Sequence, residues 1–195
     1  MITLPDYIID AYERIPTGKS MNVMIRHSNR FPITSDEEVF TAQLTPEGEK
    51  LAFTYGAWIN RKFDIGKIFS SPIERCLETG RQLSKGAGNG RLVLPEPILS
   101  HPNENGEYDA LDEYLETGVW PDRITQIKKL FISTNPGSKL NFFVTHDTVL
   151  ALMAAYLLKM DIRAPKDWPR FLEPMFFWKD QEKKMVSFRG NDFLI

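Results

Sequence analysis

The sequence predicts an α/β protein, a three-layer α/β/α sandwich with a mostly parallel central sheet and antiparallel strands near the C-terminus. Short apolar runs typical of strands alternate with amphipathic helical stretches, the order that produces parallel strands joined by helices. Two more strand-like runs, 175–178 and 185–188, flank a charged turn and indicate a hairpin. Because no repeat or linker divides the chain, we expect a single domain over residues 1–195.

Composition excludes several classes of protein. The 195 residues are 42% hydrophobic and 26% charged, as in globular domains, and the net charge of -2 leaves no basic surface for nucleic acid. The longest apolar stretch, 149–158, is too short for a membrane span of about 20 residues. The single cysteine, Cys76, excludes an internal disulfide and a Cys-rich zinc site. The N-terminal residues lack signal-peptide features, so we expect a cytoplasmic protein without nucleic-acid or membrane partners, of open oligomeric state.

Apolar periodicity and helix-start signals place the elements. Thr45 before Pro46 predicts a helix start, with Phe53 among the inward residues. Ser71 followed by Glu74 is a capping-box pattern and predicts a second start. We expect helices over about 4–15, 45–61, 71–86, 122–133 and 149–159, and strands over 22–26, 67–70, 92–94 and 140–145. A late aromatic group is expected to close the core: Trp168, Phe171, Phe176, Phe177 and Trp178.

Three segments place polar residues just after predicted strands. Ligands of open α/β sheets bind outside the carboxyl ends of the strands. Guanidinium groups match phosphate oxygens, and the helix start at 71–74 adds backbone N–H groups. Alone, each segment has an ordinary explanation, such as a solvated surface pair or a helix entry. Their joint placement favours a site for a tetrahedral dianion, made of Arg26, His27, Arg30, Arg75, His146 and Asp147.

These residues carry a family resemblance that runs from about residue 22 to the C-terminus. Residues 26–32, Arg-His-Ser-Asn-Arg-Phe-Pro, resemble the Arg-His-Gly-x-Arg-x-Pro signature of the histidine phosphatase superfamily. Residues 70–75 with Thr79 resemble its second motif, and 146–148 resemble the His-Asp motif of its acid-phosphatase branch. Leu-Thr-Pro-Glu-Gly at 44–48 and the run 168–178 are similar to further segments of that branch.

The sequence also departs from the family pattern. Ser28 replaces the usual glycine, which puts the close approach of the backbone to phosphate in question, and Cys76 stands where threonine is common. The chain is short for the acid-phosphatase branch and lacks its disulfides, so we expect a short form with a reduced substrate-binding cap.

The resemblance implies a phosphoglycerate mutase-like fold and hydrolysis of phosphate monoesters through a phosphohistidine. His27 would be the nucleophile, and Asp147 the general acid. The phosphate oxygens would be bound by Arg26, Arg30, Arg75 and His146. Because fixed cations neutralise the phosphate, no metal or cofactor is expected.

Two questions stay open at this level. The other branch takes its acid from a mid-chain glutamate, and Glu104 or Glu107 lies in an acidic segment at about 100–120. That segment is also expected as a small solvated insertion. The partner is a small phosphorylated molecule or a phosphoprotein carrying phosphohistidine, and a catalytically weak phosphate-binding protein is the remaining hypothesis. The sequence does not separate hydrolase from phosphotransferase.

Overall fold

The computed structural model describes residues 3–100, 110–133, 139–161 and 168–195. Their centre is a seven-stranded sheet of order β3-β2-β4-β1-β5-β6-β7. The strands are β1 (Met21–Arg26), β2 (Ile65–Ser70), β3 (Val93–Pro95), β4 (Leu140–Thr145), β5 (Pro174–Asp180), β6 (Lys183–Phe188) and β7 (Asn191–Leu194). The strands β1 to β4 are parallel, whereas β5 to β7 are antiparallel to their neighbours. The predicted fold class is confirmed.

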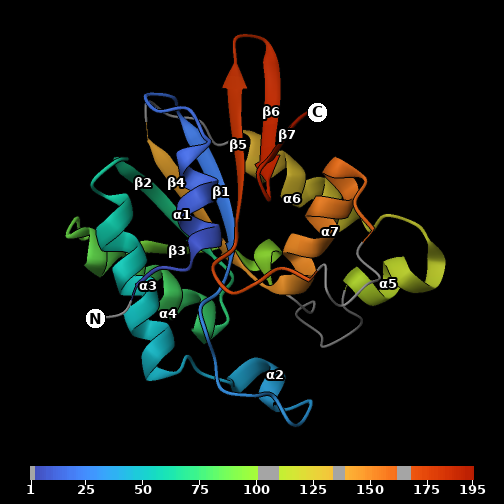
Figure 1. Ribbon diagram of the computed structural model, residues 1–195. Coiled ribbons are helices and arrows are strands. Elements are labelled where there is room, and N and C mark those ends of the chain that lie inside the picture. The colour runs from blue at the N-terminus through green and yellow to red at the C-terminus, as the bar shows by residue number, and fades with distance from the viewer. Residues whose placement is uncertain (1–2, 101–109, 134–138, 162–167) are drawn as a thin grey trace.

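Helices cover both faces of the sheet (Figure 1). One face carries α1 (Asp6–Glu13), α3 (Pro46–Ile59) and α4 (Glu74–Ala87), and the other carries α5 (Ala110–Thr117), α6 (Asp122–Ser133) and α7 (Asp147–Leu158). Successive strand residues point to opposite faces, so Val23 belongs to the core under α1, α3 and α4, whereas Met24 belongs to the core under α5 to α7. This alternation produces the expected three layers.

Several short elements were not anticipated from the sequence. They are the one-turn helix α2 (Glu38–Thr41), the 3₁₀ turn η1 (Pro97–Leu99) and strand β7, whereas α5 is the short helix expected in the acidic segment. In Figure 1, α2 lies beyond the end of the sheet, below α4 in that view. Of the expected acidic insertion, 101–109 lies outside the described residues, and α5 follows it. No helix in the described part of the chain has the length and apolar character needed to cross a membrane.

The two predicted helix starts have different outcomes. Thr45 is the N-cap of α3, and its Oγ1 accepts a hydrogen bond from the N–H of Gly48 at 3.0 Å. The capping-box prediction is wrong, because α4 begins only at Glu74 and no side chain caps it. The hydroxyl of Ser71 is instead engaged inside the protein. Phe53, expected to face inward, is 45% exposed because it falls on the solvent side of α3.

Candidate active site

Three neighbouring strands bring the candidate residues to one edge of the sheet. The strands β1 and β2 lie on either side of β4, and their carboxyl ends are level with one another. The pairing continues past the strands, because the N–H of His27 donates to the Thr145 carbonyl at 2.8 Å. The pocket at this edge has a volume of about 280 Å³ and is lined by His27, Arg30, Ile33, Val39, Arg75, Asp147, Thr148 and Trp168.

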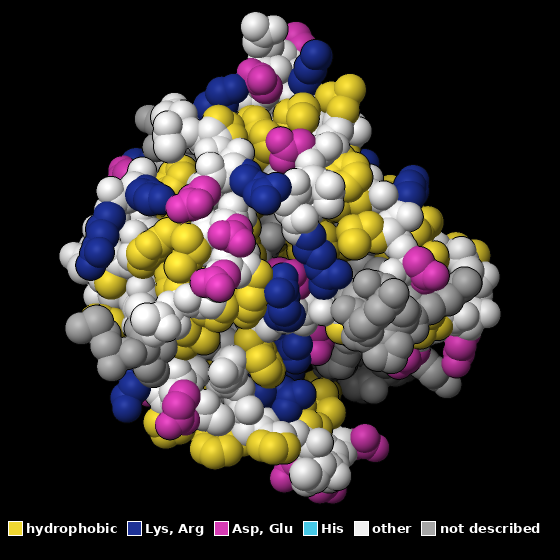
Figure 2. Space-filling model, viewed as in Figure 1, with side chains coloured by type: hydrophobic (Ala, Val, Ile, Leu, Met, Phe, Trp, Pro, Cys, Tyr) yellow, Lys and Arg dark blue, Asp and Glu magenta, His cyan; other side chains and the backbone are white. Residues whose placement is uncertain are grey.

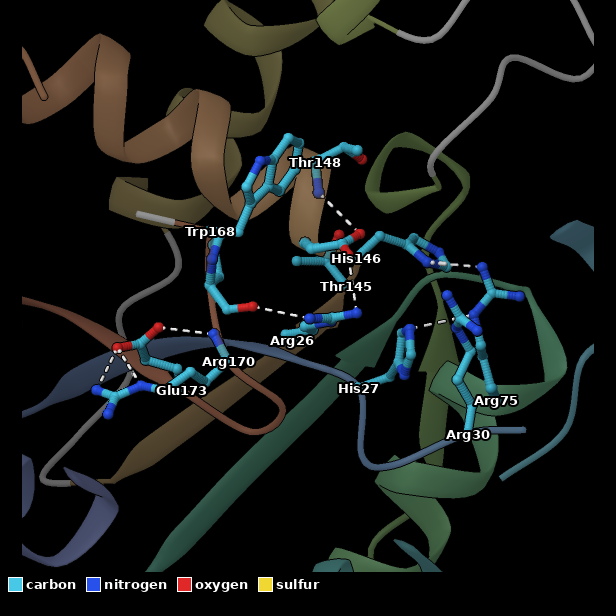
Figure 3. A network of polar contacts seen from close by, with 12 residues as sticks. Arg26, His27, Arg30, Arg75, Thr145, His146, Thr148, Trp168, Arg170 and Glu173 are labelled. Atoms are coloured by element: carbon cyan, nitrogen blue, oxygen red, sulfur yellow. Dashed lines mark hydrogen bonds and ion pairs between the residues drawn. The ribbon is translucent and has the colours of Figure 1, made fainter. Parts of the chain in front are cut away.

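Arg75 connects the two histidines. Its Nε donates to Nε2 of His27 at 3.2 Å, and its Nη2 lies 3.1 Å from Nδ1 of His146. Its Nη1 donates to the carbonyl of Val39, in α2, at 2.6 Å. Figure 3 shows the guanidinium group of Arg75 beside both imidazole rings, whose centroids are 5.6 Å apart. One side chain from the first turn of α4 therefore holds the two imidazole rings that follow β1 and β4 in place relative to each other.

The contacts of His27 determine which ring nitrogen carries the proton. Nδ1 lies 2.8 Å from the Ser28 carbonyl, which can only accept, so Nδ1 is the protonated nitrogen and Nε2 keeps its lone pair. Burial lowers the pKa of His27 well below its ordinary value, and the charge of Arg75 lowers it further. His27 is therefore neutral near pH 7, and its basic nitrogen lies on the side of Arg75.

His146 has the opposite arrangement. A guanidinium group only donates, so Nδ1 accepts from Arg75 and Nε2 carries the proton, which it donates to the Ser71 hydroxyl at 2.9 Å. The role of Ser71 is thus to orient His146 rather than to cap α4. Cys76 lies 3.5 Å from the same nitrogen, and burial raises the pKa of its thiol to about 12, so it stays a neutral thiol.

Arg26 takes a different position from the one expected of a phosphate ligand. Its Nη2 pairs with Oδ2 of Asp147 at 2.8 Å, and its Nη1 donates to the Pro169 carbonyl at 2.8 Å. Its guanidinium carbon lies 4.0 Å from the centroid of the Phe171 ring. Arg26 is not among the described residues that line the pocket. Of the three arginines expected at the phosphate, the structure thus brings Arg30 and Arg75 to the pocket wall.

Asp147 is the first residue of α7, and it lines the pocket. Its Oδ1 accepts from the N–H of Thr148 at 3.1 Å, while Oδ2 faces Arg26. With 29% of its side chain exposed, Asp147 can meet both a ligand and solvent. The alternative acids, Glu104 and Glu107, lie outside the described residues.

Ser28 and Gly48 explain how the loop after β1 tolerates a serine in place of glycine. The Ser28 hydroxyl donates to the Gly48 carbonyl at 2.7 Å, and its N–H donates to Oγ1 of Thr79 at 3.0 Å. The serine side chain therefore points toward α3 and is fully buried. A Cβ on Gly48 would lie 2.1 Å from the Asn29 carbonyl oxygen, so only glycine lets this loop pack directly on α3.

Sequence reasoning missed the residues that α2 and the 168–173 loop bring to the site. Trp168 lines the pocket, and the Phe171 ring lies 5.7 Å from that of His27, whereas the other three late aromatic residues belong to the core, as expected. The signal was available: β5 runs antiparallel to β1, so the residues just before β5 must lie at the same sheet edge as the end of β1. Ile33 and Val39 had no such signal.

The comparisons with known proteins find relatives by fold rather than by sequence. No family model and no curated protein sequence matches the chain. The fold is similar to that of a mycobacterial glucosyl-3-phosphoglycerate phosphatase (15% identity, TM-score 0.57), with 90% of this chain and 97% of that one covered. It is also similar to that of a phosphoglycerate mutase from Plasmodium falciparum (18% identity, TM-score 0.54), with 90% of this chain and 97% of that one covered.

A third solved structure is the ecdysone phosphate phosphatase from Bombix mori, in complex with tungstate (14% identity, TM-score 0.52, 82% of this chain and 89% of that one). All three comparisons extend over most of both chains. The chain therefore has the same fold as these phosphatases and this mutase, which confirms the phosphoglycerate mutase-like fold expected from the sequence.

Proposed function

We propose that the protein is a metal-independent phosphomonoester hydrolase that works through a phosphohistidine on His27. The observation that carries the proposal is the state of His27, a buried neutral imidazole with its basic Nε2 toward Arg75. A neutral imidazole is a nucleophile, and the guanidinium groups of Arg75 and Arg30 supply charge that a phosphate dianion needs. Structural neighbours named as phosphatases support the same reaction class.

In the first half-reaction, the phosphate oxygens take the donors that Arg75 now directs at the histidines, and Arg30 binds from the mouth of the pocket. Nε2 of His27 attacks phosphorus in line, the N–P bond forms and the bond to the leaving oxygen breaks. Protonated Asp147 gives its proton to that oxygen. The carbonyl of Ser28 stabilises the Nδ1 proton as positive charge develops on the ring.

In the second half-reaction, water replaces the leaving group. The Asp147 carboxylate takes a proton from the water, whose oxygen attacks phosphorus while the N–P bond breaks. Inorganic phosphate leaves, His27 is again neutral, and Asp147 is again protonated for the next cycle. Arg75 stabilises the phosphate oxygens in both transition states. His146, also expected to bind phosphate, is buried and is not among the described residues that line the pocket, and both of its ring nitrogens are engaged by Arg75 and Ser71, so its part is to position the Arg75 guanidinium group.

The pocket volume bears on the substrate. A space of about 280 Å³ suits a phosphoryl group with a small organic part, which would contact Ile33, Val39 and Trp168. A second candidate is a phosphoprotein phosphatase acting on phosphohistidine. It is favoured by Phe31 and Phe40, which lie in the same segment as Ile33 and Val39 and are 51% and 47% exposed, because exposed aromatic side chains suit contact with a protein surface.

The test of the proposed function is hydrolysis of p-nitrophenyl phosphate in EDTA between pH 4 and 8. We expect wild-type activity to survive the chelator and His27→Ala to lose at least about 10⁴-fold in turnover, as for other removed nucleophiles. Alkaline quenching, which preserves the acid-labile N–P bond, followed by ³¹P NMR should detect the phosphohistidine in the wild type alone. Absence of wild-type activity at every pH would favour a phosphate-binding protein or a demanding protein substrate.

The general acid is tested by comparing two leaving groups. Asp147→Asn should slow an alkyl phosphate about 10²- to 10⁴-fold and an aryl phosphate much less, because a phenolate leaves without protonation. Glu104→Gln and Glu107→Gln are the matched variants and should leave both rates nearly unchanged. An equal loss on both substrates in Asp147→Asn, or a selective loss in a glutamate variant, would contradict this assignment.

A further inference from the structure

A second pocket lies on the other side of the 168–173 loop from the active site. Its volume is about 220 Å³. Helix α1, the residues that lead into β5, and the turn between β6 and β7 form its walls, with Tyr7, Asp10, Ala11, Arg14, Arg170, Glu173, Pro174, Arg189 and Gly190 lining it. The face viewed in Figure 2 carries a central row of Lys and Arg side chains, below the β5–β6 hairpin and above α2. The proposed function uses none of the residues of this second pocket.

Arginine dominates the lining. Glu173 is only 2% exposed and accepts from Arg170 at 2.7 Å and from Arg189 at 3.1 Å. Burial by itself would raise the pKa of Glu173, but the hydrogen bonds from Arg189 and Arg170 outweigh it and hold the pKa below its usual value. Three guanidinium groups face two carboxylates, those of Glu173 and Asp10, so one positive charge remains in excess.

Arg14 and Arg170 are placed so that donors remain for a ligand. Arg170 directs Nε and Nη2 to Glu173, and its guanidinium group stacks 3.8 Å from the centroid of the Tyr7 ring. Arg14 makes a hydrogen bond of 3.4 Å to the Gly190 carbonyl. A guanidinium group has five N–H donors, so these contacts use only part of the set. The stacking on Tyr7 fixes the plane of Arg170, which lowers the entropy lost when an anion binds.

The backbone around the pocket is held in unusual conformations. Arg189 and Gly190 form the two-residue turn between β6 and β7, with φ of 52° and 75°, and Leu172, beside Glu173, has φ of 58°. Positive φ at both turn positions is the usual geometry of a two-residue hairpin turn, although a residue other than glycine is uncommon at such an angle. The turn presents Arg189 to Glu173. Gly190 also makes room for Arg14, because a Cβ at this position would lie 3.0 Å from Nη1 of Arg14.

We infer that this pocket binds a free tetrahedral oxyanion, such as phosphate or sulfate, as a second site that is separate from the catalytic one. The excess positive charge and the remaining guanidinium donors of Arg14 and Arg170 favour a compact dianion. The inference goes beyond the proposed function, since phosphate is the product of the reaction and would be bound at a second place.

The 168–173 loop connects the two sites. Figure 3 shows Arg170 and Glu173 on one side of Arg26, and His27 and Arg75 on the other. The Pro169 carbonyl accepts from Arg26, while the Phe171 carbonyl accepts from the Tyr7 hydroxyl at 2.7 Å. An anion that draws Arg170 toward itself therefore acts on a loop whose next residues touch Arg26 and His27.

The test is calorimetric titration of the whole protein with inorganic phosphate. We expect two bound phosphates in the wild type. Arg14→Gln/Arg170→Gln should weaken one site at least about tenfold, because it removes two charge-assisted donors. Arg30→Gln/Arg75→Gln should abolish the other. Arg61→Gln, an exposed arginine on neither pocket wall, is the matched control and should keep both sites.

Each outcome is decisive for one of the two sites. A wild type that binds a single phosphate, lost only in Arg30→Gln/Arg75→Gln, would overturn the second site and leave the proposed function intact. A single phosphate lost only in Arg14→Gln/Arg170→Gln would support the second site and contradict the catalytic one. If the double variant unfolds, Arg14→Gln alone leaves both partners of Glu173 in place. Unchanged phosphate binding in that folded variant would overturn the inference.

Discussion

Arg26 and Arg75 lie on either side of β4 at the same sheet edge, and they have different surroundings. Arg75 extends from the first turn of α4 between two neutral imidazole rings and donates to both. Arg26, the last residue of β1, lies between the carboxylate of Asp147 and the ring of Phe171. Both are largely buried, and burial lowers the pKa of each.

The comparison teaches that the partner, more than the residue type, determines what a guanidinium group can do. Neutral acceptors leave the charge of Arg75 available to an arriving dianion. The charge of Arg26 is already balanced by Asp147, so its contribution is to hold that carboxylate and the 168–173 loop in place. We therefore expect substitutions of the two arginines to affect different steps.

Of the changes that test this comparison, Arg75→Gln should have the largest effect. Loss of a donor that serves the phosphate in the transition state costs about 10²- to 10³-fold in kcat/KM, for aryl and alkyl phosphates alike. Steady-state kinetics with both substrates measures it. Arg81→Gln, on the same helix and paired with Glu74 and Glu78, is the control and should retain full activity. Equal rates for Arg75→Gln and Arg81→Gln would contradict the assignment of Arg75.

Arg26→Gln should have a smaller and more selective effect. Removing the ion pair that orients Asp147 should slow an alkyl phosphate about tenfold, as expected for one charge-assisted hydrogen bond, and an aryl phosphate less. Affinity for inorganic phosphate should stay within about threefold of the wild type. A parallel loss of phosphate affinity and of both rates would show that Arg26 binds phosphate directly, which would remove the distinction between the two arginines.

The smallest effect concerns stability and pH. Folding lowers the pKa of His27 well below 6.5, its ordinary value. As the pH falls below 6.5, the unfolded chain therefore binds more protons than the folded protein, and the free energy of unfolding decreases. Between pH 7.5 and 5.5, this one group should lower the free energy of unfolding by about 1.4 kcal/mol. Urea unfolding of the wild type and His27→Gln at both values measures it. The variant should lose less stability on acidification, and equal losses would contradict a depressed pKa.

The fold could be predicted because its signals are local and redundant. The strand Leu140–Thr145 and the helix Asp122–Ser133 have the predicted bounds, since an apolar run or a clear periodicity defines them. The start of α4 could not be predicted, because Ser71 satisfies the capping pattern but tertiary contact with His146 takes its hydroxyl. Strand β7 is short and half polar, so its own residues carry no strand pattern. Only its pairing with β6 makes it a strand.

The sequence predicts which residues form the candidate site, but only part of how their side chains are arranged. Strand ends place His27, Arg75 and His146 together by topology alone. The direction taken by Arg26 depends on Pro169 and Phe171, more than 140 residues away in the chain, and no local pattern encodes such a contact.

Gly48 shows how far the effect of the site extends into residues that touch no ligand. Its missing side chain lets the loop after β1 rest on α3 through backbone atoms, where a methyl group would lie 2.1 Å from a carbonyl oxygen. In a survey of random mutants selected for activity, this position should tolerate no replacement at all, although it is absent from the pocket wall. Gly48, which supports the loop that carries His27, would then be as intolerant of mutation as His27 itself.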